Sequence, residues 1–349
     1  MAGEVFTRMP AHKSLTLWNV LWLMLLGGCS QPDVPDSIEE YQARLTRVLD
    51  ITPVTLPSPA PLNFPSRESL HVDVPSMNIN LREFYALQDC EIGTLVAERN
   101  TALGRTPHPS QRFRYETRLI NALDACIDVL NNEKPELAEK LAEWKQQKLQ
   151  QRDTVWANLI TTSEAMRLAM TLPRGWIQQD LNPDAGAAVN AIGYLNKLKS
   201  TLSLSVNELD EQLKQIESSR LPARLWMTQD YLQVTLTELT ASLAEPLNAV
   251  SCPEGRASDD AKILRNVFYL FFIEQIQPVG SNINQYYYQI QPVLTQWQTD
   301  PSLSESFNVF LKERELKFTA YQKAVSDHVT LWQRFLKRCN LSPTAPAAS

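Results

Sequence analysis

One short polar segment holds the residues with the best spacing for chemistry. It runs from Glu98 to Arg105, and a second polar group follows where the next helix is predicted. The candidate side chains are Glu98, Arg99, Asn100, Arg105, Arg114 and Glu116. Arginines beside an asparagine can bind an anion through bidentate, charge-assisted hydrogen bonds. Because ion-pair networks often resemble functional sites, we expect a buried polar network that locks a helical hairpin, with anion binding as the alternative.

Other motifs that carry chemistry are missing from the chain. It contains no Gly-x-Ser-x-Gly, no glycine-rich phosphate loop and no His-Glu-x-x-His. His71, His108 and His328 are far apart, and His328 shares the apolar register of the last predicted helix with Arg314. A core histidine is the expected role there. We therefore expect no metal, no cofactor and, on balance, no enzymatic activity.

Two aromatic clusters leave a second class of function open. Phe268–Phe272 and Tyr286–Tyr288 could line a pocket, although aromatic residues at helical spacing usually form core. The alternative function is therefore a hydrolase, or a protein that handles lipid or another hydrophobic ligand. A cavity of several hundred Å³ with converging polar groups would favour that alternative. A filled core would favour a binding or scaffolding protein.

The first 30 residues have the pattern of a secretory signal. Arg8 and Lys13 precede the apolar run 21–26, which ends in Gly27-Gly28-Cys29. The run is too short to span a bilayer as a mature helix, and Met9 is an alternative start to Met1. Leu26-Gly27-Gly28-Cys29 resembles a bacterial lipobox, which implies cleavage before Cys29 and acylation of that cysteine, with palmitate among the acyl groups. Several acyl chains hold a protein at a membrane almost permanently.

The residue after the cysteine and the net charge bear on location and partners. Ser30 stands where, in the systems this segment resembles, an aspartate retains the protein at the inner membrane; the resemblance implies the periplasmic face of the outer membrane. Removal of residues 1–28 leaves 31 basic and 38 acidic side chains, a net charge of −7. That charge argues against nucleic acid and against polybasic lipid binding. We expect membrane contact through acyl chains and an envelope protein as partner.

The composition predicts an all-α fold. Glycine is sparse, at ten residues in 349, and apolar residues recur at three- and four-residue spacing. We expect long antiparallel helical hairpins in an elongated bundle, with an extended proline-rich strap before it. The expected organisation is a signal peptide at 1–28, a tether at 29–35, a short helix and proline-rich strap at 36–75, an all-helical domain at 76–341 and a disordered tail at 342–349.

In the N-terminal half, the sequence predicts four features. Ser37 and Glu40 form a capping box that opens a helix, and the strap that follows could pair as a strand over 70–74. Residues 81–131 form a helical hairpin. The next helix runs over 135–170 and projects into solvent at Lys148 and Gln151, where its apolar register is interrupted.

In the C-terminal half, residues 188–216 and 225–247 are expected to pack against each other as an antiparallel pair. Ser258 caps a helix that is apolar on every side over 267–273 and is therefore central. Pro278 and Gly280 end that helix. A last helix carries one long aromatic stripe from Phe307 onward.

The four cysteines after Cys29 suggest two disulfides. An even number in an oxidising compartment favours pairing, and four cysteines allow three connectivities. Cys90 and Cys126 lie on the two arms of the first predicted hairpin, so we pair them. Cys252 is then left with Cys339. Four buried free thiols are the alternative.

Several segments together resemble one family. They are the lipobox, the proline strap, Asn80–Phe84, the Cys90 helix, the Glu98–Arg105 segment and Arg114–Glu116, and they are most specific over 80–126. The chain resembles an uncharacterised proteobacterial lipoprotein family that is known only as a domain of unknown function. The resemblance implies lipidation, a helical fold and an envelope location, and it implies nothing about activity. We expect a binding or scaffolding protein of the cell envelope.

Overall fold

Helices account for all the regular structure in the part of the chain that the computed structural model describes, which is residues 32–75, 79–100, 108–201 and 206–342. The chain divides into two compact units, Met1–Asp33 and Val34–Ser349. The expected signal peptide, Cys29 and the tail after Ser342 lie outside the described residues. The expected all-α fold is confirmed, and the strand considered at 70–74 does not form.

The second unit opens with α2 (Val34–Leu49), whose buried face carries Ile38, Tyr41 and Leu45. The predicted capping box is wrong. Ser37 lies inside the first turn and is buried, because the helix already begins at Val34, whose side chain is also buried.

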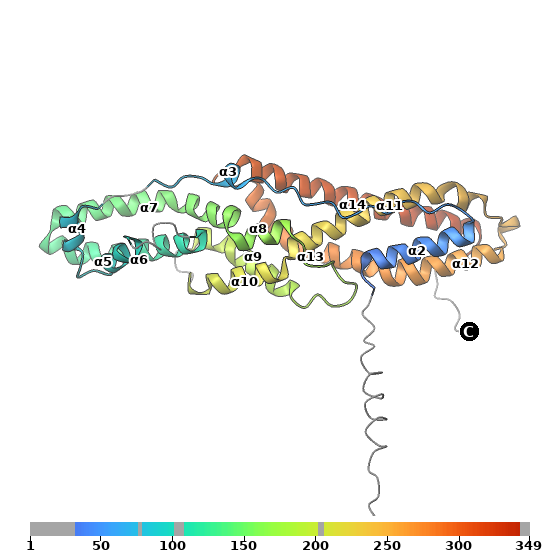
Figure 1. Ribbon diagram of the computed structural model, residues 1–349, viewed down its shortest axis with the longest axis horizontal. Coiled ribbons are helices and arrows are strands. Elements are labelled where there is room, and N and C mark those ends of the chain that lie inside the picture. The colour runs from blue at the N-terminus through green and yellow to red at the C-terminus, as the bar shows by residue number, and fades with distance from the viewer. Residues whose placement is uncertain (1–31, 76–78, 101–107, 202–205, 343–349) are drawn as a thin grey trace, which may run out of the picture. The chain divides into compact units, whose positions relative to one another are not determined.

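The proline-rich strap follows α2 and contains only the single helical turn α3 (Arg67–Leu70). Figure 1 shows it as a thin blue trace beside α7, α11 and α14. The strap buries its own Leu62 and Leu70 side chains. Asn158 of α7 holds the strap at Val72, since its amide accepts from the Val72 N–H at 2.9 Å and donates to the Val72 carbonyl at 2.7 Å.

The next part of the unit is a helical hairpin with two short helices packed on it. The hairpin pairs α6 (Pro109–Glu133) with α7 (Pro135–Thr162), joined through Lys134 alone. The short helices are α4 (Leu81–Ala86) and α5 (Glu91–Asn100), and α5 packs on α6. The first arm of the predicted 81–131 hairpin is thus two helices, because the chain bends at 87–90. Leu81, at the start of the predicted hairpin, is exposed, whereas Leu87 at the bend is fully buried.

The predicted 135–170 helix is interrupted at Ser163. After it come α8 (Glu164–Thr171), α9 (Ala185–Ser200), the short turn η2 (Val206–Glu208) and α10 (Leu209–Ser219). α10 packs against α9 and α8 rather than against the helix that follows it. The expected pairing of 188–216 with 225–247 is therefore wrong.

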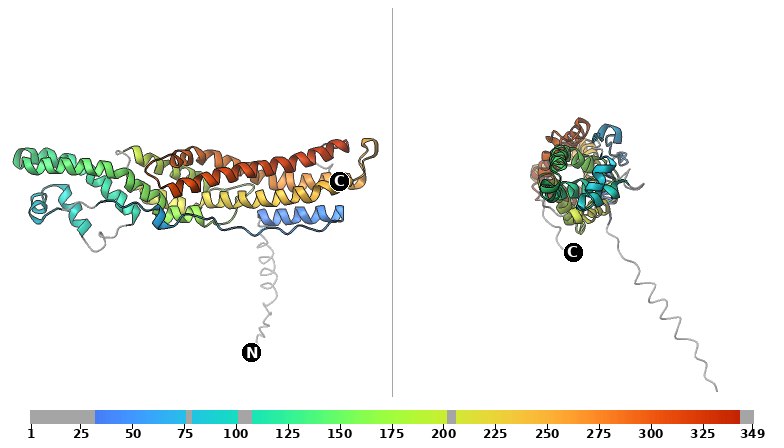
Figure 2. Two further views of the ribbon diagram at one scale, coloured as in Figure 1. Left: turned by 90° about the horizontal axis from the view of Figure 1, so that it is seen from above. Right: turned by 90° about the vertical axis from the view of Figure 1, so that its left-hand side faces the viewer.

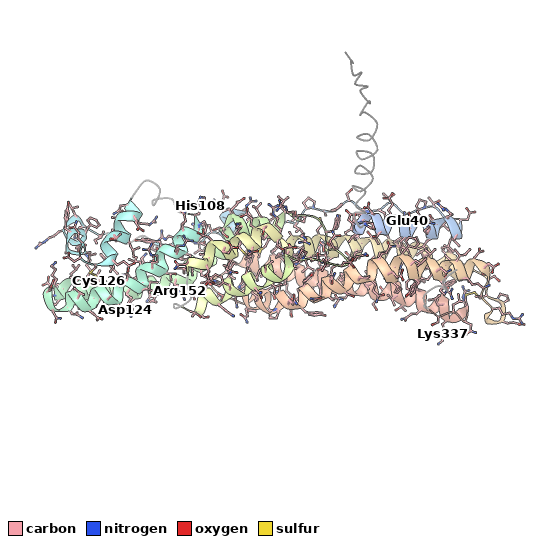
Figure 3. The ribbon with its side chains drawn as sticks, turned by 90° about the horizontal axis from the view of Figure 1, so that it is seen from below. Glu40, His108, Asp124, Cys126, Arg152 and Lys337 are labelled. Atoms are coloured by element: carbon pink, nitrogen blue, oxygen red, sulfur yellow. A yellow bond between two sulfur atoms is a disulfide. The ribbon has the colours of Figure 1, made fainter. Side chains whose placement is uncertain are left out.

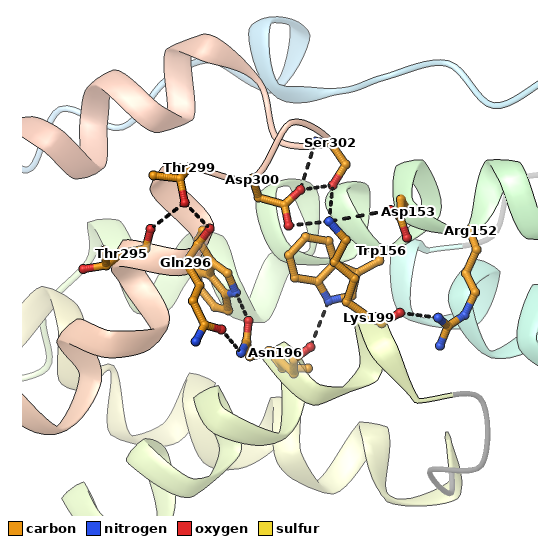
Figure 4. A network of polar contacts seen from close by, with 12 residues as sticks. Arg152, Asp153, Trp156, Asn196, Lys199, Thr295, Gln296, Thr299, Asp300 and Ser302 are labelled. Carbon is orange, nitrogen blue, oxygen red and sulfur yellow. Dashed lines mark hydrogen bonds and ion pairs between the residues drawn. The ribbon is translucent and has the colours of Figure 1, made fainter.

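A polar network joins α7, α9 and the turn before the last helix (Figure 4). Arg152 of α7 donates to the carbonyls of Leu198 and Lys199 at the end of α9, and Lys199 pairs with Asp300. The Trp156 indole donates to the Leu195 carbonyl at 2.8 Å. These contacts give the buried Arg152 of α7 and the partly buried Lys199 of α9 a structural role.

The rest of the unit is built on three long helical segments, which are α11 (Leu221–Ala249), the run α12–η4–α13 and α14 (Glu305–Arg338). α11 and α14 lie side by side and run parallel (Figures 1 and 2). Arg314, near the start of α14, pairs with Asp230 near the start of α11. Arg338, at the end of α14, donates to the Leu247 and Asn248 carbonyls at the end of α11.

The segment that lies between α11 and α14 in the sequence returns the chain to the start of α14. It comprises α12 (Asp259–Val267), the π-helical η4 (Phe268–Ile276) and α13 (Gln277–Gln298). The predicted break at Pro278 and Gly280 is wrong. Pro278 lies in the first turn of α13, where a missing N–H is tolerated. Gly280 allows close contact with α14, since a Cβ there would lie 2.9 Å from the Tyr321 hydroxyl.

Ser258 caps α12 by accepting from the Ala261 N–H, as expected. The run 267–273 is not buried on every side, however, because Leu270 is exposed. Its buried side carries Phe268 and Phe272, which stack at 5.2 Å between ring centroids.

Both disulfides have the expected pairing. Cys90 is bonded to Cys126 and ties the bend after α4 to α6. Cys252 is bonded to Cys339 and ties the loop after α11 to the end of α14. Figure 3 labels Cys126 among the side chains of α6. Because α11 and α14 run parallel, the second bridge closes the same end of both helices.

Two hydrophobic clusters fill the unit. The larger one involves α2, the strap and the helices from the end of α7 to α14, and the smaller one lies among α5, α6 and the first half of α7. Among the described residues, no helix combines the length and apolar character that a membrane crossing needs.

Candidate functional site

A cavity of about 200 Å³ opens among α5, α6 and α7, beside the smaller hydrophobic cluster. Its lining has two chemically different parts. The apolar part is Ile79, Ile92, Val96, Leu119, Leu123 and Trp144. The polar part is Arg99, Asn100, Arg112, Tyr115, Glu116 and Lys148. The cavity is therefore amphipathic, with charged groups gathered on one side.

Helical spacing places the polar groups together. Arg112 and Glu116 are four residues apart on α6, and Trp144 and Lys148 are four residues apart on α7, so each pair shares a face of its helix. Because α6 and α7 are the two arms of one hairpin, these faces meet. Arg99 enters from the last turn of α5.

Glu116 is at the centre of the charges. Its Oε1 lies 2.6 Å from Arg112 Nε, and its Oε2 lies 2.9 Å from Lys148 Nζ. The Glu116 and Lys148 side chains are only 5% and 6% exposed. The two oxygens of this buried carboxylate therefore face two different cations.

Positive charge exceeds negative charge in this lining. Among the described residues that line the cavity there are three cations, Arg99, Arg112 and Lys148, and one carboxylate, Glu116. Burial lowers the pKa of Lys148, Glu116 raises it again in part, and Arg112 and Arg99 lower it further. Burial and then Arg112 lower the pKa of Arg99. The formal charge of the lining is therefore +2 with all four groups ionised.

Tyr115 completes the polar side as a neutral donor. Its ring lies 5.7 Å from the Arg99 guanidinium carbon, a cation–π contact. Burial, followed by the neighbouring Glu116 charge, raises the pKa of Tyr115 to about 12. Its hydroxyl therefore keeps its proton at neutral pH. Cations, a phenol and an amide can bind an anion, and the described residues of the lining include no nucleophile paired with a base.

Comparison with known protein families shows where the chain belongs. Residues 38–343 match the family described as "Protein of unknown function (DUF3080)". The chain belongs to this family. Neither the curated proteins nor the solved structures yield a match.

The matched DUF3080 region includes every residue that lines the cavity. Four of the six predicted polar candidates are part of the site or close to it. Arg99, Asn100 and Glu116 line the cavity, and Glu98 forms an ion pair with Arg118 at 3.7 Å. Arg114 instead pairs with Asp210 of α10, and Arg105 lies outside the described residues.

Two central residues of this DUF3080 chain were missed by sequence reasoning. Lys148 was expected in solvent, and that is wrong because α6 brings Glu116 against it. Arg112 was not selected at all. One signal in the sequence could have found Lys148. Glu116 interrupts the apolar stripe of one helix and Lys148, of opposite charge, interrupts that of the next, which indicates that the two could pair.

The aromatic clusters pack largely against other rings, and Phe268 and Ile273 also border an open cavity of about 610 Å³. Phe268 stacks on Trp332 at 4.6 Å and Tyr287 on Phe318 at 3.4 Å between ring centroids. The cavity beside Phe272 and Tyr321 measures about 160 Å³. Among the described residues, no group of three or more His, Cys, Asp or Glu side chains is placed to hold a metal.

Proposed function

We propose that this DUF3080 protein is a lipid-anchored protein of the cell envelope that binds a small anionic ligand in the cavity among α5, α6 and α7. The observation that carries the proposal is that three cations and a phenol gather around one buried carboxylate on the wall of that cavity. Guanidinium, ammonium and phenol groups that converge on one cavity can donate hydrogen bonds to an anion, and those from the charged groups are the stronger ones.

The cavity also favours binding over catalysis. A ligand anion there would accept hydrogen bonds from Arg99, Arg112 and the Tyr115 hydroxyl, while Glu116 keeps Lys148 in place. No observation favours the hydrolase alternative, since the aromatic side chains that suggested it pack against one another.

The anchor rests on the sequence Leu26-Gly27-Gly28-Cys29. The folded unit begins at Val34, five residues after Cys29. Five residues span at most roughly 18 Å when extended. Acylation of Cys29 would therefore hold α2 close to the membrane surface.

Anion binding is tested by thermal melting and titration calorimetry with inorganic phosphate and sulfate. We expect a saturable rise in the melting temperature of the parent protein, as for any ligand that binds only the native state. Lys148→Met should reduce that rise, because it removes one of the three cations of the lining while Glu116 remains. The matched control is Lys317→Met, which removes a half-exposed lysine paired with Asp230 on the α11–α14 face. If the parent melting temperature does not respond to either anion, the binding function is wrong.

The anchor is tested separately by fractionation of Cys29→Ala. We expect the parent protein with the outer membrane and the variant in the soluble periplasmic fraction. A variant that still fractionates with membranes would refute lipid anchoring without affecting the binding proposal.

A further inference from the structure

A second cavity of about 300 Å³ adjoins the first between the strap and the α6–α7 hairpin. It is lined by Arg67, His71, Asp73, Val74, Arg99, Pro109, Arg112, Val155, Asn158 and Thr162. Arg99 and Arg112 line both cavities. The two arginines therefore stand at the boundary between an amphipathic cavity and a mainly polar one.

The walls of the second cavity suit a polar, uncharged or zwitterionic group. His71 Nε2 and Asp73 Oδ1 lie 3.5 Å apart on the strap, where they place a hydrogen-bonding donor and acceptor on the solvent-exposed side of the cavity. Asn158 fixes this part of the strap through its two hydrogen bonds to Val72. The polar wall is thus held in place relative to α7.

We propose that the ligand is an amphiphilic phosphodiester, with its phosphate at Arg99 and Arg112, an apolar chain in the first cavity and a polar head in the second. This inference rests on the proposed anion-binding function. Because the two arginines lie between the cavities, an anionic group bound to them should carry one substituent into each cavity. A carboxylate is the end of a molecule, whereas a phosphodiester keeps one negative charge while carrying a substituent on each side.

The apolar part of the first cavity suits a chain. Ile92, Leu119 and Leu123 are buried, and Trp144 and Val96 are partly buried beside them. About 200 Å³ is less than the roughly 300–1,000 Å³ of sites that enclose drug-sized ligands. The first cavity therefore takes a short chain or the first part of a longer one, and the two cavities together reach the usual range.

The experiment is a calorimetric series with the full-length, folded protein. The probes are inorganic phosphate, then butyl, hexyl and octyl phosphate, then the octyl phosphate diester of glycerol, all below their micellar concentrations. Each buried methylene should tighten binding about fourfold, which is ~0.8 kcal/mol, until the first cavity is full. The glycerol diester should bind at least as tightly as octyl phosphate even though it carries less charge.

Two variants divide the effect between the cavities. Val96→Phe fills the apolar part, so the gain with chain length should vanish while inorganic phosphate still binds; the control is Val129→Phe, an exposed position on α6. His71→Ala should weaken the diester but leave octyl phosphate unchanged. Its control is His108→Ala, because His108 lines neither cavity. Melting curves of each variant establish that it is folded.

The outcomes separate this inference from the function on which it rests. Binding of phosphate without any chain-length gain would overturn the amphiphile and leave the anion site standing. Octyl phosphate that binds much more tightly than its glycerol diester would overturn the phosphodiester. If no probe binds, including inorganic phosphate, the proposed function fails and the inference fails with it. A last comparison identifies the source of the ligand. Binding of the monomeric esters alone would indicate a soluble ester, whereas additional binding of lipid from phosphatidylglycerol vesicles would indicate a membrane lipid.

Discussion

Lys148 and Glu116 form a buried ion pair across the α6–α7 hairpin, with Nζ 2.9 Å from Oε2. Arg112 contacts the other carboxylate oxygen at 2.6 Å. The pair therefore belongs to a larger group in which Glu116 is the single negative charge among the described residues that line the cavity. Replacing Glu116 and replacing Lys148 should consequently lower the free energy of unfolding by different amounts.

We expect Glu116→Gln to destabilise the protein by about 3 kcal/mol, because it leaves cations buried without compensation. Lys148→Met should cost less, on the order of 1 kcal/mol, since Glu116 keeps Arg112 and one repulsive charge is gone. Urea denaturation of the two variants and the double variant measures this difference. A larger loss for Lys148→Met than for Glu116→Gln would show that excess positive charge does not dominate the site.

Because His328 is buried in the core formed by α2, α11 and α14, we expect the stability of the protein to depend on pH. The Trp332 indole donates to His328 Nε2 at 3.2 Å, so the imidazole proton must be on Nδ1, 2.9 Å from the Thr240 hydroxyl. Tyr41 of α2 also contacts Nε2, at 3.0 Å. Burial lowers the pKa of His328 from 6.5 to about 3.

In the native state His328 stays neutral, whereas in the unfolded chain it becomes protonated below about pH 6.5. Its contribution to the free energy of unfolding should therefore be fully present above that pH. It should fall as the pH drops, by about 2 kcal/mol between pH 7.5 and 5. Carboxylates titrate mainly below this window. Denaturation midpoints at several pH values measure the slope, and His328→Phe should flatten it. An equal slope in the parent and the variant would contradict this origin.

Gly93 should not tolerate a side chain. A Cβ there would lie 2.5 Å from the Leu87 carbonyl oxygen and 3.0 Å from its carbon, which are backbone atoms that cannot move aside. We expect Gly93→Ala to destabilise the α4–α5 region by about 1–3 kcal/mol, read as faster hydrogen exchange there. The matched control is Gly193→Ala in α9, where a Cβ meets nothing within 4 Å and helix propensity should add up to about 1 kcal/mol. Equal effects would refute the steric argument.

Asn158→Ala should release the strap at Val72, since it removes both hydrogen bonds that hold this residue. We expect trypsin to cleave after Arg67 several times faster, with a loss of about 1–3 kcal/mol from the unpaired backbone groups. Asn196→Ala, which removes an amide that bonds Trp297 and Gln296, is the control for a general loss of stability. An unchanged cleavage rate at Arg67 in Asn158→Ala would contradict the clamp.

The residue pattern alone determined much of the local structure. Helix-forming composition, three- and four-residue apolar spacing and the cap at Ser258 predicted the helices, because these signals act within one or two turns. Both cysteine pairings also followed from positions along the chain. The apolar stripe of α14 could be predicted for the same reason, since Phe307, Phe318 and Trp332 repeat with one helical register.

Tertiary structure alone decided which helices meet. The apolar stripe of 225–247 fits several partners equally well, and it packs parallel to α14 rather than against 188–216 because the intervening α12–α13 segment returns the chain. The same holds for the site. A lysine at position 148 of a mostly polar helix is expected to be exposed to solvent. It can be buried only if a carboxylate on another helix compensates its charge. Burial of a charge depends on a partner distant in sequence, and only the α6–α7 hairpin brings Glu116 to within 2.9 Å of it.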